Sequence, residues 1–382
     1  MSQLVTNDVV SICDFFKDLS DPRSAVNRKH LLGDLIVICV CGVIAGADGP
    51  RAIGMWADSN ADWLRQHLAL PNGIPSHDTV GRLLATLKPS AFQSCFEKWI
   101  QSLRNDDTSN DEVIAIDGKA LRRSHDRKNN LGALFLVSAW SVQNGISLGQ
   151  LATEEKSNEI TAIPDLLDKI DVNKAIVTID AAGCQTNIAA KIIDGGGDYV
   201  LALKGNQKKT HKDVLSWVLP HVENDFADVT MRKHEEIVEG HGRVDRLIYY
   251  QILVPDELPT RNRWKDLRTI GVAIRLSSKE GKVTQDARFF LSSLPLGVKR
   301  FANAVRGHWA IENTLHWCLD VTFREDESRL RNRFAADNIA WLKRFAISLL
   351  KQQKDKESVA MRRRMAGWNT KYLAQVLGIP TV

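Results

Sequence analysis

The chain has 382 residues, of which 44% are hydrophobic and 25% are charged. This composition excludes a disordered or low-complexity protein, and the length predicts two or three domains at roughly 150 residues each. The net charge of +5 permits an anionic partner without requiring one. The longest apolar run, Leu35 to Ala47, is too short to cross a bilayer. The 6 cysteines form no C-x-x-C pair, so we expect reduced thiols in a cytoplasmic protein with no membrane association.

Residues 1–104 predict a small all-helical domain. Leu31 to Ala45 has the pattern of a nearly all-round apolar helix, and Ile53 to Leu68 has a broader amphipathic pattern. Pro75 to Thr79 forms a turn whose serine and aspartate can cap the helix that follows. Such a unit is consistent with a helix-turn-helix reader of DNA, although any three-helix packing module has the same pattern.

A polar, acidic stretch at residues 105–112 predicts a linker, and an α/β core follows it. Val113 to Lys119 places four apolar residues before Asp117 and a glycine, the pattern of a buried strand that delivers a carboxylate to a sheet edge. Ala175 to Asp180 repeats this pattern. Two acids at one sheet end supply the oxygens that divalent metal ions need for phosphoryl transfer.

The order of the elements around these acids predicts a ribonuclease H-like core. Two strand-like runs at 133–142 and 145–152 form a hairpin after the first acidic strand. A helix beginning near Ser157, the strand that ends at Asp180, a helix, the strand Tyr199 to Leu203 and another helix follow. In this core the first and fourth strands are neighbours, so the topology and the positions of the acids agree.

After the core, the composition changes twice. Residues 226–294 are rich in β-branched and aromatic residues and predict a mostly antiparallel inserted element, and helices return near Val298. The basic tail is most simply a solvated face, with phosphate contacts as the alternative. We therefore expect a helical N-terminal, DNA-binding domain (1–104), a catalytic domain (105–225 and 295–350), a β-rich insertion (226–294) and a basic helical tail (351–382).

A site built on two aspartates needs a further carboxylate, and Glu312 is the candidate. In an α-helix of about 100° per residue, Val305 and Leu319 fall within about 20° of it. A carboxylate on such an apolar stripe is unfavourable unless it is paired or bound to a metal ion. The position of Glu312 therefore calls for a partner.

A zinc site on the same helix is an alternative. Four candidate ligands recur at four-residue steps: His308, Glu312, His316 and Asp320. Imidazole and carboxylate groups suit zinc, but stacked His and Glu side chains on helices commonly only hydrogen-bond. We therefore favour the two aspartates with Glu312.

Several short motifs extend beyond these acids. They are Asp117 to Arg122, Lys156 to Ile160, Thr178 to Gln185, Tyr199 to Gln207, His241 to Asp245, and His308-Trp309 with Ile311 to Asn313. With them the sequence resembles the insertion-sequence DDE transposases, and closely the H-repeat-associated transposase group. Asp21 to Arg23 and Pro75 to Thr79 resemble the helical region that precedes the catalytic domain in that group. The resemblance covers nearly the whole chain.

The resemblance implies that Asp117, Asp180 and Glu312 form a catalytic triad that holds Mg²⁺, with Mn²⁺ as an alternative. It implies hydrolysis of DNA at the element's ends and attack of the freed 3′-hydroxyl on target DNA. The implied partner is double-stranded DNA, and we expect a homodimer because two ends must be brought together. One departure is that the wider group of transposases carries a Tyr and an Arg ahead of the glutamate and a Lys after it, whereas the matching positions here hold Val305, His308 and Leu319.

Basic side chains near the acids are candidates for DNA contacts. They are Lys119, Arg122, Arg123, Lys204, Arg306 and His308. Lysines and arginines after a strand form a solvated loop in most proteins, and an aspartate there is often an ordinary turn former. Glu159 is either a helix start or a residue near the active site.

These patterns favour a DNA transposase, a metal-dependent endonuclease and strand transferase of the bacterial nucleoid. A catalytically inactive, transposase-derived DNA-binding protein is the alternative, and the presence of all three acids favours the enzyme. A structure-selective nuclease on the same core is a third candidate, but it would not need the insertion between Asp180 and Glu312.

Overall fold

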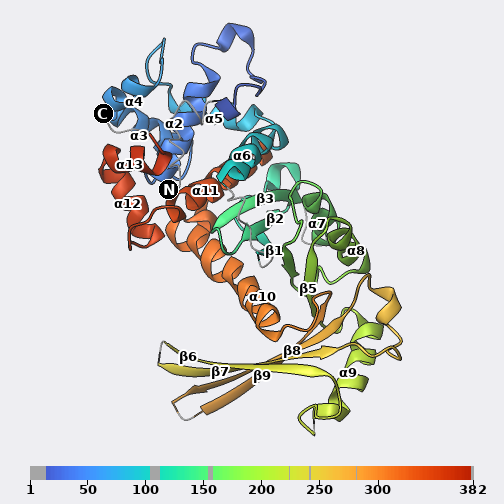
Figure 1. The fold of residues 1–382 in the computed structure, drawn as a ribbon. Helices are drawn as coiled ribbons and strands as arrows, with labels where there is room; N and C mark the ends of the chain where they lie inside the picture. The colour runs from blue at the N-terminus through green and yellow to red at the C-terminus, as the bar shows by residue number, and fades with distance from the viewer. Residues whose placement is uncertain are drawn as a thin grey trace, which may run out of the picture.

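The computed structural model describes residues 14–103, 112–153, 158–222, 224–240, 242–280 and 282–379. The linker expected at 105–112 lies outside these residues except for Glu112, and Lys156 also lies outside them. Figure 1 shows a helical lobe that contains helices from both ends of the chain and a sheet that extends away from it.

The first part of the helical lobe confirms the predicted helical region. Its elements are η1 (Ala25–Asn27), α2 (Leu32–Ile44), α3 (Pro50–Ser59), α4 (Ala61–His67), α5 (His77–Thr86) and α6 (Pro89–Leu103). Most of α2 is buried, as its apolar sequence predicts, and the side chain of Ser76 caps α5 by accepting from the Thr79 N–H. The amphipathic stretch expected as one helix forms two, α3 and α4, which meet at Asn60.

The middle part of the chain contains the sheet predicted from the strand order. Its elements are β1 (Val113–Leu121), η2 (Arg127–Asn129), β2 (Leu134–Ser141), β3 (Ile146–Thr153), α7 (Glu159–Leu167), β4 (Ile176–Ile179), α8 (Thr186–Asp194), β5 (Asp198–Leu203) and α9 (Lys208–Val222). Strands β1, β2 and β3 are antiparallel neighbours, whereas β4 is parallel to both β1 and β5. The order β3-β2-β1-β4-β5 is that of a ribonuclease H-like core.

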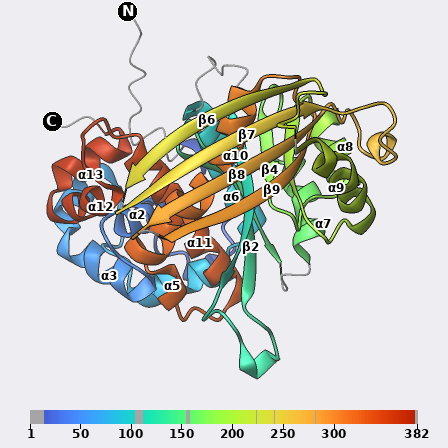
Figure 2. The ribbon, with the colours of Figure 1, turned by 90° about the horizontal axis from the view of Figure 1, so that it is seen from below.

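The β-rich insertion extends the core sheet. It comprises β6 (Met231–Gly240), β7 (Arg243–Leu253), η4 (Arg261–Arg263), β8 (Thr269–Lys279) and β9 (Lys282–Ser292). Because β9 pairs antiparallel with β5, the sheet continues without interruption as β5-β9-β8-β7-β6. Figure 2, which is seen from below, shows these four long strands running side by side in front of α10 (Val298–Ala310).

The C-terminal elements connect the sheet to the first helices. After α10 come η5 (Ile311–His316), η6 (Cys318–Thr322), η7 (Glu325–Glu327), α11 (Arg333–Lys351), α12 (Val359–Trp368) and α13 (Thr370–Leu377). Helix α11 contacts β3 on one side and α2, α5 and α6 on the other, and α12 also contacts α2. The chain's two ends therefore share the helical lobe, as Figure 1 shows with its blue and red helices.

The tail differs from the solvated basic face expected from sequence. Arg362 and Arg363 are buried and pair with Asp355 and Asp48. Arg363 also donates to the backbone carbonyls of Val43, Ala47 and Thr322, and it stacks on the ring of Phe323. Burial is tolerated because the guanidinium groups are paired and hydrogen-bonded.

Among the described residues, no helix is long and apolar enough to span a bilayer. The five described cysteines, Cys39, Cys41, Cys95, Cys184 and Cys318, are buried free thiols. Cys13 lies outside the described residues.

Candidate active site

Asp117 and Asp180 lie side by side where the parallel pairing of β1 with β4 ends. The expectation that the first acidic strand stops at Asp117 is wrong, because β1 continues to Leu121 in its pairing with β2. In the parallel pairing of β1 with β4, Ile116 is the partner of Ile179, so each aspartate is the next residue in register. Parallel neighbouring strands are separated by about 4.8 Å. The pairing of the two acidic strands predicted from the sequence is therefore present.

Backbone N–H groups hold one oxygen of each aspartate. The Oδ1 atom of Asp117 accepts from the N–H of Gly118 at 2.9 Å. The Oδ1 atom of Asp180 accepts from Ala182 at 2.9 Å and Gly183 at 3.3 Å. The simpler interpretation of these residues as turn formers thus describes part of what they do, and it fixes the orientation of both carboxylates.

The surroundings of Asp117 are strongly acidic. Burial raises the pKa of Asp117 to about 7, and the carboxylates of Asp180, Glu159 and Glu312 act in the same direction against the lowering effect of the Gly118 N–H. Three carboxylates are therefore close enough to act on Asp117. A carboxyl group perturbed by burial and by specific neighbouring charges is typical of a functional site.

Glu159, treated from sequence as a helix start or a residue near the site, is both. It is the first residue of α7 and is 4% exposed. A Cβ atom built on Gly118 would lie 2.7 Å from the Oε1 atom of Glu159 and 2.4 Å from the ring of Phe135. The lack of a side chain at Gly118 therefore lets the Glu159 carboxylate approach the strand that carries Asp117.

The expectation that Glu312 lies on a buried apolar stripe is wrong. Val305 and Leu319 are buried, but Glu312 is exposed and lies in η5, which winds as a π-helix. A π-helix has i→i+5 hydrogen bonds, so the 100° step of an α-helix no longer assigns residues to faces. Glu312 is nevertheless near enough to Asp117 to raise its pKa.

The four residues considered as zinc ligands have separate neighbours. His308 lies 3.3 Å from the hydroxyl of Thr178, His316 lies 3.4 Å from Asp117, and Asp320 pairs with Lys119. Nowhere in the described part of the chain do three or more His, Cys, Asp or Glu side chains form a group arranged to hold a metal ion. The four-residue spacing in the sequence therefore does not correspond to one shared metal site in the structure.

Lys119 was predicted to contact DNA phosphate groups, which requires an exposed ammonium group, but its side chain is largely buried. Its side chain is 10% exposed and lies within 3.3 Å of carboxylate oxygens of Asp320, Glu325 and Asp326. Burial lowers the pKa of Lys119, but these three carboxylates outweigh it and raise the pKa overall. Its position thus gives no support to the predicted DNA contact.

Of the three partners of Lys119, Glu325 and Asp326 were not singled out from the sequence, and Asp320 was considered only as a zinc ligand. Glu325 is buried, and burial opposes its ionisation, yet the charges of Arg344, Lys119 and Lys343 lower its pKa to about 2. Two signals could have identified this cluster. One is the acidic run Glu325 to Glu327 shortly after Glu312, and the other is a Lys-Arg pair, Lys343-Arg344, inside an otherwise apolar helix.

The other predicted DNA-contact residues lie at the surface. Arg122 and Arg123 are exposed at the end of β1, and Arg122 pairs with Asp326 at 3.2 Å. Lys204 is exposed after β5, and two residues later Asn206 donates to the Ala181 carbonyl beside Asp180. His308, in contrast, is largely buried, and burial lowers its pKa.

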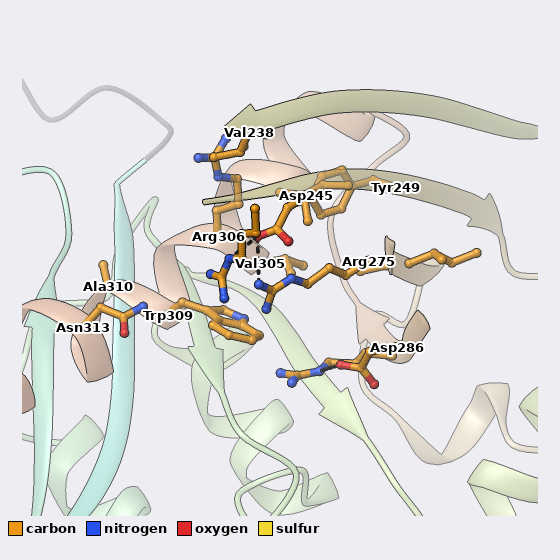
Figure 3. A pocket seen from close by; sticks show the side chains of 15 residues that line it. Val238, Asp245, Tyr249, Arg275, Asp286, Val305, Arg306, Trp309, Ala310 and Asn313 are labelled. Atoms are coloured by element: carbon orange, nitrogen blue, oxygen red, sulfur yellow. Dashed lines mark hydrogen bonds and ion pairs between the residues drawn. The ribbon is translucent and has the colours of Figure 1, made fainter. Parts of the chain in front are cut away.

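A groove of about 580 Å³ lies between α10 and the extension strands. Figure 3 shows Arg306 and Trp309 of α10 facing Arg275 across it. The guanidinium of Arg288 lies 4.4 Å from the ring centre of Trp309, and Arg306 pairs with Glu236. Because Ala310 and Asn313 also line the groove, it reaches the segment that carries Glu312. Arg275 and Arg288 were not predicted, because only the sheet register brings them to α10.

The strand order, with two aspartates side by side where the β1–β4 pairing ends, defines a ribonuclease H-like protein. The chain matches the family model described as "Transposase DDE domain" over residues 108–350 and the model "DDE_Tnp_1-associated" over residues 13–100. It belongs to the DDE transposase family.

Relatives of nearly full length support this membership. The chain is 39% identical to "Putative transposase YncI" of Escherichia coli O157:H7 over 97% of its own length and 95% of the relative. It is 37% identical to "H repeat-associated putative transposase YhhI" of Escherichia coli strain K12, over 94% and 95% of the two chains. A piggyBac transposase structure in complex with hairpin DNA has a TM-score of 0.42 and 11% identity, covering 98% of this chain and 83% of that one. That likeness is too remote to carry an argument.

Proposed function

We propose that this protein is an insertion-sequence transposase that cleaves DNA at the ends of its element and joins the cut ends to target DNA. The observation that carries the proposal is the β1–β4 register, which makes Asp117 and Asp180 neighbours. The nearness of Glu159 and Glu312 to Asp117 adds the carboxylates that such a site needs.

Asp117, Asp180 and Glu312 are the proposed ligands of divalent cations, Mg²⁺ or Mn²⁺. The chemistry of these donors suits hard cations, which take carboxylate oxygens, and a cation would offset the carboxylate charges that add to the effect of burial on the pKa of Asp117. When bound, a divalent cation lowers the pKa of the attacking water or hydroxyl group and stabilises negative charge on the phosphate. Backbone N–H groups engage Oδ1 of Asp180, which leaves its Oδ2 atom for the cation.

Double-stranded DNA is the proposed substrate and partner. The exposed Arg122 and Arg123 follow β1, five and six residues beyond Asp117, and the exposed Lys204 follows β5, the strand that pairs with β4. Arginines bind phosphate groups through paired N–H donors, so the groove beside Arg306 is a second candidate surface for the DNA backbone. A homodimer on DNA is part of the proposal, because two element ends must react together.

Cleavage of a labelled duplex tests the proposal. The duplex carries the DNA that flanks this gene, and the reactions contain Mg²⁺, Ca²⁺ or a chelator. We expect cutting at an element boundary that requires Mg²⁺ and is abolished by Asp180→Asn, with DNA binding changed by no more than a few-fold. Asp168→Asn is the matched control, because Asp168 is a surface residue paired with Lys191.

The outcome separates the two candidate functions. Cutting that survives Asp180→Asn would show that the proposed site is wrong. Binding without cutting, by a folded protein under several metal conditions, would favour an inactive DNA-binding protein. One relative, which is 37% identical over 17% of this chain, is named "Inactive transposase YbfQ".

A further inference from the structure

Lys119 connects two parts of the chain that are far apart in sequence. It projects from the same face of β1 as the residue two positions earlier, the first acid of the proposed triad. Its ammonium nitrogen lies 2.7 Å from Asp320, 3.1 Å from Asp326 and 3.3 Å from Glu325. These carboxylates belong to η6 and η7, which follow the third acid of the triad. The Lys119 side chain thus bridges β1, which carries Asp117, and the segment that follows Glu312.

Arg344 holds the same acidic cluster from the opposite side. It is fully buried and donates to Glu325 at 2.8 Å and to the hydroxyl of Ser138 at 3.1 Å. Ser138 on β2 is the register partner of Asp117 on β1. The cluster therefore closes a ring through β1, β2, α11 and the segment after Glu312.

The conformation of the segment around Glu312 depends on tertiary contacts. Both η5 and η6 wind as π-helices, which are rare and usually limited to a single turn. Their winding is therefore set by tertiary contacts more than by local preference. Removing one partner of a buried ion pair is strongly unfavourable, because the remaining charges lose their compensation.

We propose that Lys119 is a positioning residue that fastens η6 and η7 to β1, and through them the preceding η5, and so sets the separation of the Glu312 and Asp117 carboxylates. The catalytic meaning of that separation rests on the function proposed above. Without the ammonium group, three carboxylates repel one another beside β1 and the segment moves away from the strand.

The test compares three variants of the full-length protein. Lys119→Met removes the bridge, and Lys119→Arg keeps a cation that can restore it. Lys343→Met is the matched control, because Lys343 is a buried lysine whose charge also acts on Glu325 but which belongs to α11 and not to β1. Asp320→Asn removes one partner of Lys119 and serves if Lys119→Met does not fold.

Two measurements report on the bridge. The first is amide hydrogen exchange of residues 311–327 without metal or DNA, and the second is Mg²⁺ binding by calorimetry. We expect Lys119→Met to speed exchange in this segment and to weaken Mg²⁺ binding by about tenfold each, with peptides from α2 unchanged. Lys119→Arg should return both to within about threefold of the wild type, and Lys343→Met should affect neither by more than that.

The results also separate this inference from the proposed function. Equal effects of Lys119→Met and Lys343→Met, or exchange unchanged by Lys119→Met, would overturn the positioning role. A wild-type protein that cleaves no DNA would contradict the proposed function. Faster exchange in Lys119→Met that is confined to residues 311–327 would still support the bridge.

Discussion

The imidazole of His316 lies against the carboxylate of Asp117, with 3.4 Å between Nδ1 and Oδ2. Burial lowers the pKa of His316 to about 3, and the charges of Arg344 and Lys119 add to this effect. The ring is therefore neutral at ordinary pH, and its contact with Asp117 is not an ion pair. His316 therefore adds no positive charge to the acidic surroundings of Asp117.

We predict that His316→Gln lowers the rate of DNA cleavage without changing the shape of its pH profile. Residues that orient a metal ligand typically contribute about 10- to 100-fold to activity. Since His316 stays neutral, it adds no titration between about pH 5.5 and 8.5. The measurement is the cleavage rate of both proteins across that range at saturating Mg²⁺. Loss of an ionisation step in the variant would contradict the assignment of a neutral imidazole.

Glu159 provides a second prediction, about the charge of the site. Its carboxylate raises the pKa of Asp117, so Glu159→Gln should lower that pKa and reduce the attraction for cations. We expect Mg²⁺ binding to weaken by about 3- to 10-fold. Calorimetric titration with Mg²⁺ measures the change. Glu97→Gln is the control, because Glu97 is also a partly buried carboxylate but lies on α6. Equal affinities for the wild type and Glu159→Gln would limit Glu159 to a structural role.

The part of the site that could be predicted from sequence lies on strands. The runs that end at Asp117 and Asp180 are short, apolar and bounded by small residues, and such patterns identify buried strands locally. The order of the elements then made these strands neighbours. The β-rich composition of 226–294 also predicted strands, but composition does not determine which strand they pair with, so the continuous nine-stranded sheet was not predicted.

The part that could not be predicted depends on distant partners. The π-helical winding around Glu312 has no periodic signature in a short segment, so the α-helical spacing assigned that residue to the wrong face. Lys119 and Asp326 are 207 positions apart, and no local pattern indicates such a pair. Arg363 looked like part of a solvated tail because nothing near it in sequence shows that it would cap the end of α2.

A third prediction concerns the close approach at Gly118. An added Cβ atom would lie 2.4 Å from the Phe135 ring, so Gly118→Ala forces the ring or the strand to move. Overpacking of this kind costs about 1–3 kcal/mol of stability. Urea unfolding measures the loss, and the double variant Gly118→Ala with Phe135→Leu should recover part of it. Additive losses in the double variant would mean that the Phe135 ring is not the obstacle.

The last relationship with a measurable consequence is the burial of Asp337 on α11. Gln150 donates to its Oδ1 atom at 2.5 Å, and Gln93 does so at 3.4 Å. Burial raises the pKa of Asp337 to about 6, because the hydrogen bond from Gln150 and the charges of Arg344 and Lys169 only partly compensate. A raised carboxyl pKa means that folding stability is highest when the group is protonated. The stability is lost as the pH rises from the unfolded value near 4 through about 6.

Asp337→Asn should therefore stabilise the protein at pH 8 and have little effect near pH 4. A shift of about two pKa units corresponds to a gain on the order of 2–3 kcal/mol at the higher pH. The Asn side chain keeps an oxygen that accepts from Gln150, so the hydrogen bond survives. Urea unfolding at both pH values provides the measurement. Asp355→Asn is a control of opposite sign, because hydrogen bonds from Arg362 and Tyr372 lower the pKa of Asp355 and its charge stabilises the fold at pH 8. A gain for Asp337→Asn that is equal at both pH values would mean that ionisation of Asp337 is not the cause.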